Sequence, residues 1–169
     1  MSAEQRRIQG SVGLDVLRVI VSVAICLAVG ALGGLMMTDS TWTWYQSLKQ
    51  PALTPPSWVF APVWTALYIM MGVALFLVWR RSTRRVKVGV AVVAFAMQLL
   101  LNAIWTPVFF GLQDPGAALI IIGLLWLAIL TTIVLFWRLS RAASILMMPY
   151  ILWVSFASYL NYAIVVLNP

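Results

Sequence analysis

Two consecutive blocks of this chain read WYQSLKQP (residues 44–51) and PPSWVFAPVWT (residues 55–65). Residues 42–64, which include most of both blocks, hold four tryptophans, one tyrosine and four prolines. Proline fixes the backbone and interrupts regular helices, so this stretch cannot form one long helix. Rigidly held aromatic side chains between two long apolar runs predict a structured lid or wall beside a membrane.

The composition around these blocks is that of an integral membrane protein. The 169 residues are 63% hydrophobic and 9% charged, with a mean hydropathy of +1.00, and a soluble domain of this length needs more charged surface. Five apolar segments can each cross roughly 30 Å of hydrocarbon at about 20 residues per helix. We expect an all-α bundle of five transmembrane helices, in a single domain over residues 1–169 with a lid loop at 38–57. The expected spans are residues 14–37, 58–79, 88–110, 117–137 and 143–167.

Basic residues are concentrated in alternate connectors. The net charge is +7, and its carriers are Arg6 and Arg7 before the first span, a cluster at residues 80–87 after the second, and Arg138 and Arg141 after the fourth. The opposite connectors carry a single lysine, Lys49. This positive-inside pattern predicts a cytoplasmic N-terminus and a C-terminus outside. The charge is therefore a topology signal, with contact to anionic lipid headgroups as a secondary role, and no nucleic-acid partner is expected.

Ionisable groups are absent from the middle of the five expected spans. The sequence contains no histidine, and its one cysteine, Cys26, lies within the first apolar run. Ion-coupled carriers usually keep ionisable side chains at mid-depth, and metal sites usually need histidine or several cysteines. We therefore expect neither an ion-coupled carrier nor a metal site, and no obligatory cofactor.

The third expected span carries one polar and aromatic face, formed by Gln98, Asn102, Trp105 and Phe109 at helical spacing. Pro107 should leave the carbonyl of Ala103 without its usual partner and bend this helix. Two interpretations remain open for the face. It can be an interhelical hydrogen-bond ladder, for example between Asn102 and Asn161, or the wall of a pocket with Asn102 as its polar group.

Two further spans carry aromatic faces. In the fifth span Tyr150, Trp153, Ala157 and Asn161 share a face, and Pro149 should kink the helix near its start. In the second span Trp64 precedes Tyr68 by four residues and lies about six residues from the outer end, roughly 9 Å deep. An apolar site with aromatic walls and few polar groups suits a large, flat, lipophilic ligand.

These blocks resemble the TspO/MBR family, the tryptophan-rich sensory proteins that include the mitochondrial translocator protein. The matching motifs are WYxxLxxP at 44–51, PPxWVFxPVWTxLY at 55–68, QLxLNxxWTPxFFG at 98–111 and PYxxWxxFAxxLN at 149–161. They cover the chain from about residue 44 onward in the family's order, whereas the first span matches only in hydrophobicity. The resemblance implies a five-helix bundle, often homodimeric, with a cavity beneath the first long loop.

The resemblance also implies a ligand class and a set of site residues. Members of the family bind porphyrins such as protoporphyrin IX, and many bind cholesterol and benzodiazepine-type drugs. By motif position, the ligand-binding residues here would be Tyr45, Trp64, Asn102, Trp105, Trp153 and Ala157, with Phe60, Pro56 and Leu160 as weaker candidates. The family's sterol motif cannot be completed, because no basic residue follows Arg141. For oligomerisation, Gly30-x-x-x-Gly34 offers a small-residue surface that can serve a dimer or packing inside the bundle.

Three functions fit these features. The first, which we favour, is a binding or sensory protein for tetrapyrroles and other flat lipophilic ligands in a prokaryotic cell membrane. The second is an enzyme that degrades porphyrin in light, as reported for some bacterial members, with Trp64 and Trp153 as its photochemical residues. The third is a carrier of porphyrins or other lipophilic molecules.

Overall fold

A computed structural model gives the fold, and it describes residues 3–36, 38–80 and 85–169. Side chains are described from residue 12 in the first helix and from residue 86 in the fourth. The predicted end of the first span at residue 37 and two members of the basic cluster, Arg81 and Arg84, lie outside the described residues. The same holds for the side chains of Arg6, Arg7 and Arg85.

The described residues form an all-helical bundle with five apolar segments long enough to cross a membrane, which confirms the predicted fold class. The helices are α1 (Ala3–Gly34), α3 (Phe60–Trp79), α4 (Arg85–Thr106), α5 (Pro115–Trp137), α6 (Arg141–Leu146) and α7 (Met148–Leu167). The third span continues beyond α4 through η3 (Pro107–Gly111), and α6 and α7 together make the fifth. Helices satisfy every interior backbone group internally, which is what a hydrocarbon environment requires.

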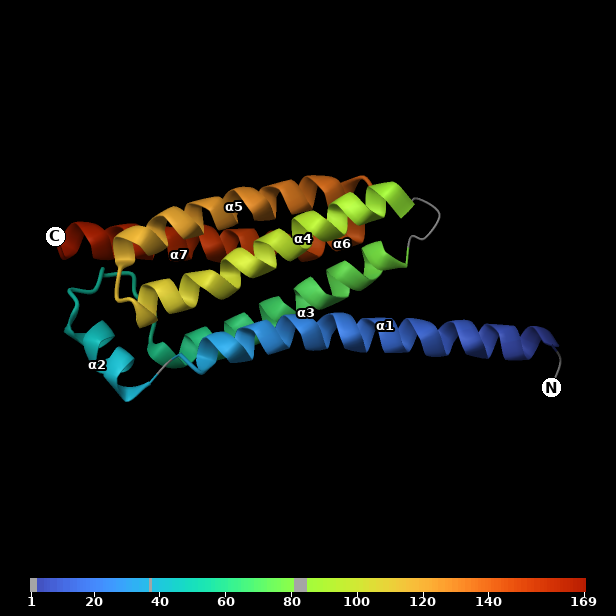
Figure 1. The fold of residues 1–169 in the computed structure, drawn as a ribbon, viewed down its shortest axis with the longest axis horizontal. Coiled ribbons are helices and arrows are strands. Elements are labelled where there is room, and N and C mark those ends of the chain that lie inside the picture. The colour runs from blue at the N-terminus through green and yellow to red at the C-terminus, as the bar shows by residue number, and fades with distance from the viewer. Residues whose placement is uncertain (1–2, 37, 81–84) are drawn as a thin grey trace.

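The arrangement of the helices places α1 at the side of the bundle. It packs against α3 and α4, whereas α5 lies between α4 and α7, and α6 lies against α3. In Figure 1 the start of α1 extends beyond the other helices, and the lid helix α2 (Asp39–Ser47) lies at the opposite end, near the C-terminus. One end of the bundle therefore carries both the lid and the end of α7.

The predicted lid loop contains regular structure. Residues Asp39–Ser47 form the short helix α2, and Ser57–Val59 form one turn, η1, at the entrance to α3. Thr38 caps α2, because its hydroxyl accepts the Thr41 N–H at 3.4 Å. The prolines at 51, 55 and 56 follow α2, so they exclude helix only from the second half of the lid. Residues 38–57 therefore contain a short helix whose position the sequence did not predict.

Two prolines reshape the third and fifth spans. Pro107 cannot donate to the carbonyl four residues earlier, and the chain from Pro107 to Gly111 widens into a π-helical turn, closed by the Leu112 N–H on the Pro107 carbonyl at 2.9 Å. Pro149 stands in the first turn of α7, and the helix is interrupted at Met147. Both positions were predicted from sequence as bends.

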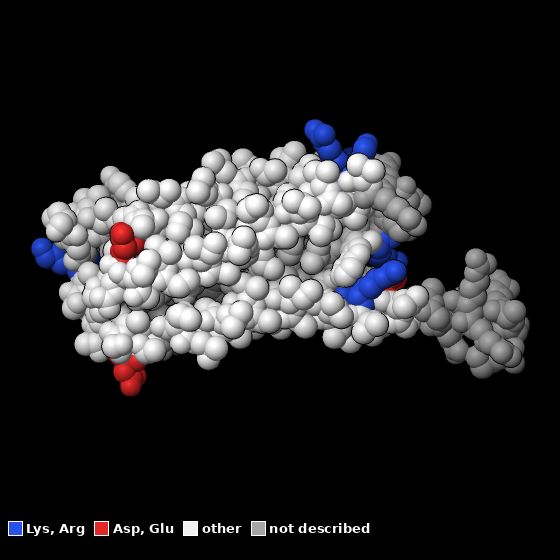
Figure 2. All heavy atoms as spheres, viewed as in Figure 1, with Lys and Arg blue, Asp and Glu red and all other residues white. Residues whose placement is uncertain are grey.

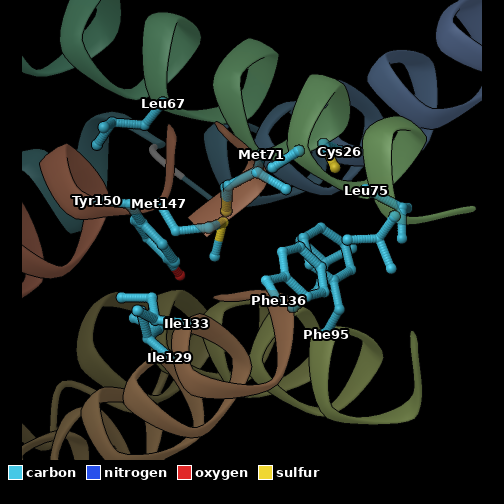
Figure 3. Close-up of a cluster of buried hydrophobic side chains, with 14 of the residues drawn as sticks. Cys26, Leu67, Met71, Leu75, Phe95, Ile129, Ile133, Phe136, Met147 and Tyr150 are labelled. Carbon is cyan, nitrogen blue, oxygen red and sulfur yellow. The ribbon is translucent and has the colours of Figure 1, made fainter. Parts of the chain in front are cut away.

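The centre of the bundle is a packed apolar core. Phe95 of α4 and Phe136 of α5 stack with their ring centroids 5.9 Å apart and their planes within 7°. Met71 of α3 and Met147, at the break between α6 and α7, fill the space beside Tyr150, and Cys26 is fully buried (Figure 3). Interiors packed in this way fix the rotation of each helix about its axis.

Two glycines allow α1 and α3 to approach each other closely. A Cβ on Gly72 would lie 2.5 Å from the Cα of Val23, and a Cβ on Gly30 would collide with the ring of Tyr68. Small residues at such crossings let helix backbones touch within a membrane. Gly30 therefore serves packing inside the bundle. At Gly34, by contrast, nothing lies within 4 Å of an added Cβ.

Charged side chains lie at the two ends of the bundle. Figure 2 shows most blue side chains at the end nearer the N-terminus and an uncharged middle. At that end the carboxylate of Asp15 accepts from Arg18 at 3.4 Å and from Arg80 at 3.3 Å, which joins α1 to the end of α3. Asp15 and Arg18 are three residues apart, a spacing that places both side chains on one face of the helix. Both pairs are solvent-exposed, so their contribution to stability is small.

The close approach of α1 and α3 can be tested by replacing Gly72 with Ala. The new methyl group meets backbone, so the helices must separate, and we expect a loss of about 1–3 kcal/mol in unfolding free energy. Denaturant unfolding of the detergent-solubilised protein measures this loss. Gly123→Ala in α5 is the matched control, because nothing lies within 4 Å of its added Cβ. Equal stability of the two variants would contradict the contact.

Candidate ligand site beneath the lid

A single amide links three helices in the interior. The Tyr68 hydroxyl of α3 donates to the Oδ1 of Asn102 in α4 at 2.5 Å, and the Asn102 Nδ2 donates to the hydroxyl of Tyr150 in α7 at 3.1 Å. Tyr150 is fully buried, and Asn102 and Tyr68 are 6% and 8% exposed. Buried polar groups need partners, and this network supplies them without any charge.

Trp64 forms the aromatic wall above this network. Its ring stacks on Tyr68 with centroids 5.6 Å apart and planes at 29°, and it meets Tyr150 edge to face at 6.2 Å. Trp64 is half-buried, so one part of the indole faces the bundle and the rest is accessible. The structure therefore brings Trp64 and Asn102 together through the two tyrosines.

The pair given as an example of the hydrogen-bond ladder, Asn102 with Asn161, is not formed. Asn161 instead accepts from the Trp105 Nε1–H at 3.2 Å and donates to the carbonyl of Pro115 at 2.8 Å. Because Trp105 follows Asn102 by three residues on the same face of α4, the partner of Asn161 lies about one turn nearer the lid. The ladder exists, but each asparagine bonds to aromatic residues or backbone rather than to the other.

Trp105 joins this interior to the lid. It stacks on Phe109 with centroids 5.1 Å apart, and it packs against both the main core and a second cluster that includes Tyr45. The rings of Phe109 and Phe110 are 4.8 Å apart, and both meet Tyr45 of α2, at 6.2 and 5.6 Å. The lid is therefore in aromatic contact with the π-helical end of the third span.

Tyr45 is a neutral part of this contact at physiological pH. Burial raises the pKa of its phenol above the ordinary value of 10.0, because the charged form loses hydration. Folding favours the protonated phenol. The contribution of Tyr45 to the free energy of lid docking is therefore fully present below pH 10 and declines at higher pH.

Trp153 and Ala157 of α7 pack against the same core as Trp64. Trp153 meets Phe60, at the start of α3, edge to face at 6.0 Å, and its indole Nε1–H is buried without a partner among the described residues. Ala157 is half-buried against the same core. A buried donor without an acceptor is costly in a native interior, and it is a candidate contact for a ligand.

The remaining two candidates differ in exposure. Leu160 is buried in α7 at 7% exposure, whereas Pro56 is exposed just before η1. The six main candidates thus fall on four elements: Tyr45 on α2, Trp64 on α3, Asn102 and Trp105 on α4, and Trp153 and Ala157 on α7.

The sequence did not single out Tyr68 and Tyr150 as site residues. Both were placed on the correct helix faces, since Tyr68 follows Trp64 by four residues and Tyr150 precedes Trp153 by three. That spacing was the available signal, but it could not show that both hydroxyls reach one amide. The sequence also did not predict a second contact between helices. The Trp126 Nε1–H of α5 donates to the Ser155 hydroxyl of α7 at 2.8 Å.

The arrangement is suited to binding rather than to acid–base chemistry. Its side chains are indoles, phenols, phenyl rings and one primary amide, and ring faces attract flat apolar molecules by about 0.5–1.5 kcal/mol per pair beyond area burial. The fold and these residues define a class: a five-span membrane protein with a short lid helix and a candidate site of uncharged, mainly aromatic side chains.

Comparison with known proteins identifies the family. The model of the TspO/MBR family matches residues 22–167, and the chain belongs to this family. It is 46% identical to the tryptophan-rich protein TspO of Chlorobaculum tepidum, over 92% of this chain and 98% of that protein. It is 40% identical to the protein of the same name from Archaeoglobus fulgidus, over 92% and 99%. Identity to the human translocator protein is 38% over 72% of each chain.

The amide network can be tested with Asn102→Leu, which keeps a similar volume and removes both hydrogen bonds. We expect a loss of about 1–3 kcal/mol in unfolding free energy, because two buried hydroxyls lose their partner. In the double variant with Tyr150→Phe the losses should be non-additive. Additive losses in denaturant unfolding would show that Asn102 and Tyr150 do not interact.

Proposed function

We propose that this protein binds tetrapyrroles of the protoporphyrin IX type, and other flat lipophilic molecules, between the lid and the Asn102 network. The observation that carries this proposal is the continuity of aromatic surface from Tyr45 on the lid to Trp105 and Phe109. Trp64 and Trp153 stand beside the same core from α3 and α7. A macrocycle with two large apolar faces is the ligand shape that such walls contact best.

The uncharged interior supports binding of a neutral ring system. Among the described residues, the polar groups at its centre include the Asn102 amide, the two phenols that it bonds and the unpartnered Trp153 N–H. Such groups can orient a ligand by hydrogen bonds without the desolvation cost of a buried charge.

A second candidate, light-dependent degradation of the bound porphyrin, draws support from the stack of Trp64 on Tyr68. An excited porphyrin is the light absorber in this proposal, and oxidisable indole and phenol rings stand next to one another at the site. Enzymatic action then requires no acid–base group, which agrees with the neutral site.

The binding proposal predicts saturable quenching of tryptophan emission when protoporphyrin IX is titrated into the protein in lipid nanodiscs. Trp64→Phe and Trp153→Phe should each weaken binding by about 1–2 kcal/mol, or roughly 5–30-fold in Kd. Trp58→Phe is the matched control, because Trp58 is 73% exposed outside the site. Quenching that does not saturate, or that is equal in all variants, would contradict the proposal.

The same samples under illumination separate binding from chemistry. If the protein degrades porphyrin, loss of porphyrin absorbance should be faster in the wild type than in the Trp64→Phe, Trp153→Phe double variant at equal occupancy. Equal bleaching in both would leave binding as the function.

We further propose that the protein lies in a prokaryotic cell membrane with its N-terminus cytoplasmic and the lid outside. The bundle end opposite the lid carries five described basic residues, which are Arg18, Arg80, Lys87, Arg138 and Arg141. The lid end carries Lys49. Excess basic charge marks the cytoplasmic side of a multi-pass protein.

This orientation predicts that a single cysteine at Ser47, in a Cys26→Ala background, reacts with a membrane-impermeant maleimide in intact cells. A second single-cysteine variant, Ala142→Cys at an exposed position in α6, should react only after the cells are opened. The opposite labelling pattern would reverse the orientation.

A further inference from the structure

The end of the lid helix is bound to the end of the last span by one side chain. The Oδ1 of Asn168 accepts the Lys49 backbone N–H at 2.9 Å, and its Nδ2 donates to the Lys49 carbonyl at 3.2 Å. The side-chain amide therefore pairs with one residue of the lid as a neighbouring β-strand would, across 119 residues of sequence.

The orientation of this amide is set by the helix that carries it. The Asn168 Nδ2 also donates to the Ile164 carbonyl at 2.9 Å, and the Asn168 backbone N–H donates to the same carbonyl at 3.1 Å. The side chain thus stays over the last turn of α7, where it faces Lys49. The backbone bond remains when the side chain is shortened, so the helix end does not depend on the amide alone.

The lid side of this contact leads directly to the site. Lys49 follows Leu48, which packs in the same cluster as Tyr45 and Phe109, and the Gln50 Nε2 donates to the Tyr45 carbonyl at 2.7 Å. Holding Lys49 therefore holds the C-terminal end of α2, while Thr38 and Thr41 hold its start.

We propose that Asn168 is a latch that positions the lid: its two bonds to Lys49 keep α2 closed over the aromatic site, and their breaking opens the lid. As to what passes beneath the lid, the inference rests on the proposed function. The bonds to Lys49 are solvent-exposed, so water can replace them. The latch is thus weak enough to open and geometrically specific enough to return the lid to one position.

The first test needs no ligand. In Asn168→Ala, amide hydrogen exchange of residues 44–50 should be at least tenfold faster than in the wild type, with α4 and α5 unchanged, because the lid opens more often. Thr43→Ala is the matched control, since its hydroxyl is exposed and bonds only within α2, to the Asp39 carbonyl. Exchange within twofold of the wild type in Asn168→Ala would overturn the latch.

A second variant breaks the latch from the other side. Lys49→Pro removes the N–H that Asn168 accepts, and the preceding Leu48 already has φ −70° and ψ 147°, which a following proline favours. Faster exchange of residues 44–48 is expected here too, with no further increase when both changes are combined. Additive increases would show that the two residues act separately.

Ligand kinetics then test the role of the lid. For protoporphyrin IX in nanodiscs, we expect association and dissociation rates both to rise several-fold in Asn168→Ala, with Kd changed less than either rate. Unchanged rates together with faster exchange would overturn the gating role. Failure of the wild type to bind protoporphyrin IX would reject the proposed function, while the exchange data would still decide whether Asn168 latches the lid.

Discussion

The structure depends on the requirement that polar groups inside an apolar bundle find partners. Asn102 meets this requirement for three helices at once, since its oxygen accepts from Tyr68 and its nitrogen donates to Tyr150. An amide has one donor end and one acceptor end, so α3 and α7 must present their hydroxyls to opposite sides of it. That constraint sets the rotation of both helices and brings Trp64 and Trp153 to the inner face.

The lid depends on the same helix through a proline. Pro107 removes one backbone donor just after Asn102 and Trp105, and the chain widens into a π-helical turn. This turn holds Phe109 and Phe110 against Tyr45 of the lid. Stacking of Trp105 on Phe109 then connects the lid to the interior. Tyr45, Phe109 and Trp105 thus form a chain of three aromatic rings that leads from α2 to Asn161 in α7.

Sequence reasoning succeeded where a property belongs to a single segment. The five spans, the bends at Pro107 and Pro149, and the helix faces that carry the site all follow from hydropathy, proline chemistry and helical spacing. It failed where a contact depends on the position of two segments relative to each other. The pair Asn102–Asn161 was the example given for one of two interpretations, and the offset between α4 and α7 places Asn161 beside Trp105 instead. Likewise a structured lid was predicted, but the position of its helix α2 was not.

The sequence by itself determined five membrane spans with tryptophans and two asparagines on inward faces, and its motifs resemble those of the TspO/MBR family. The spans and faces need only local chemistry, because apolar length and residue periodicity do not depend on neighbours. Only the tertiary structure decided that Tyr68 and Tyr150 share Asn102, and that Asn168 reaches Lys49 on the lid. Hydrogen bonds between distant segments depend on the relative height and rotation of packed helices, which no single segment encodes.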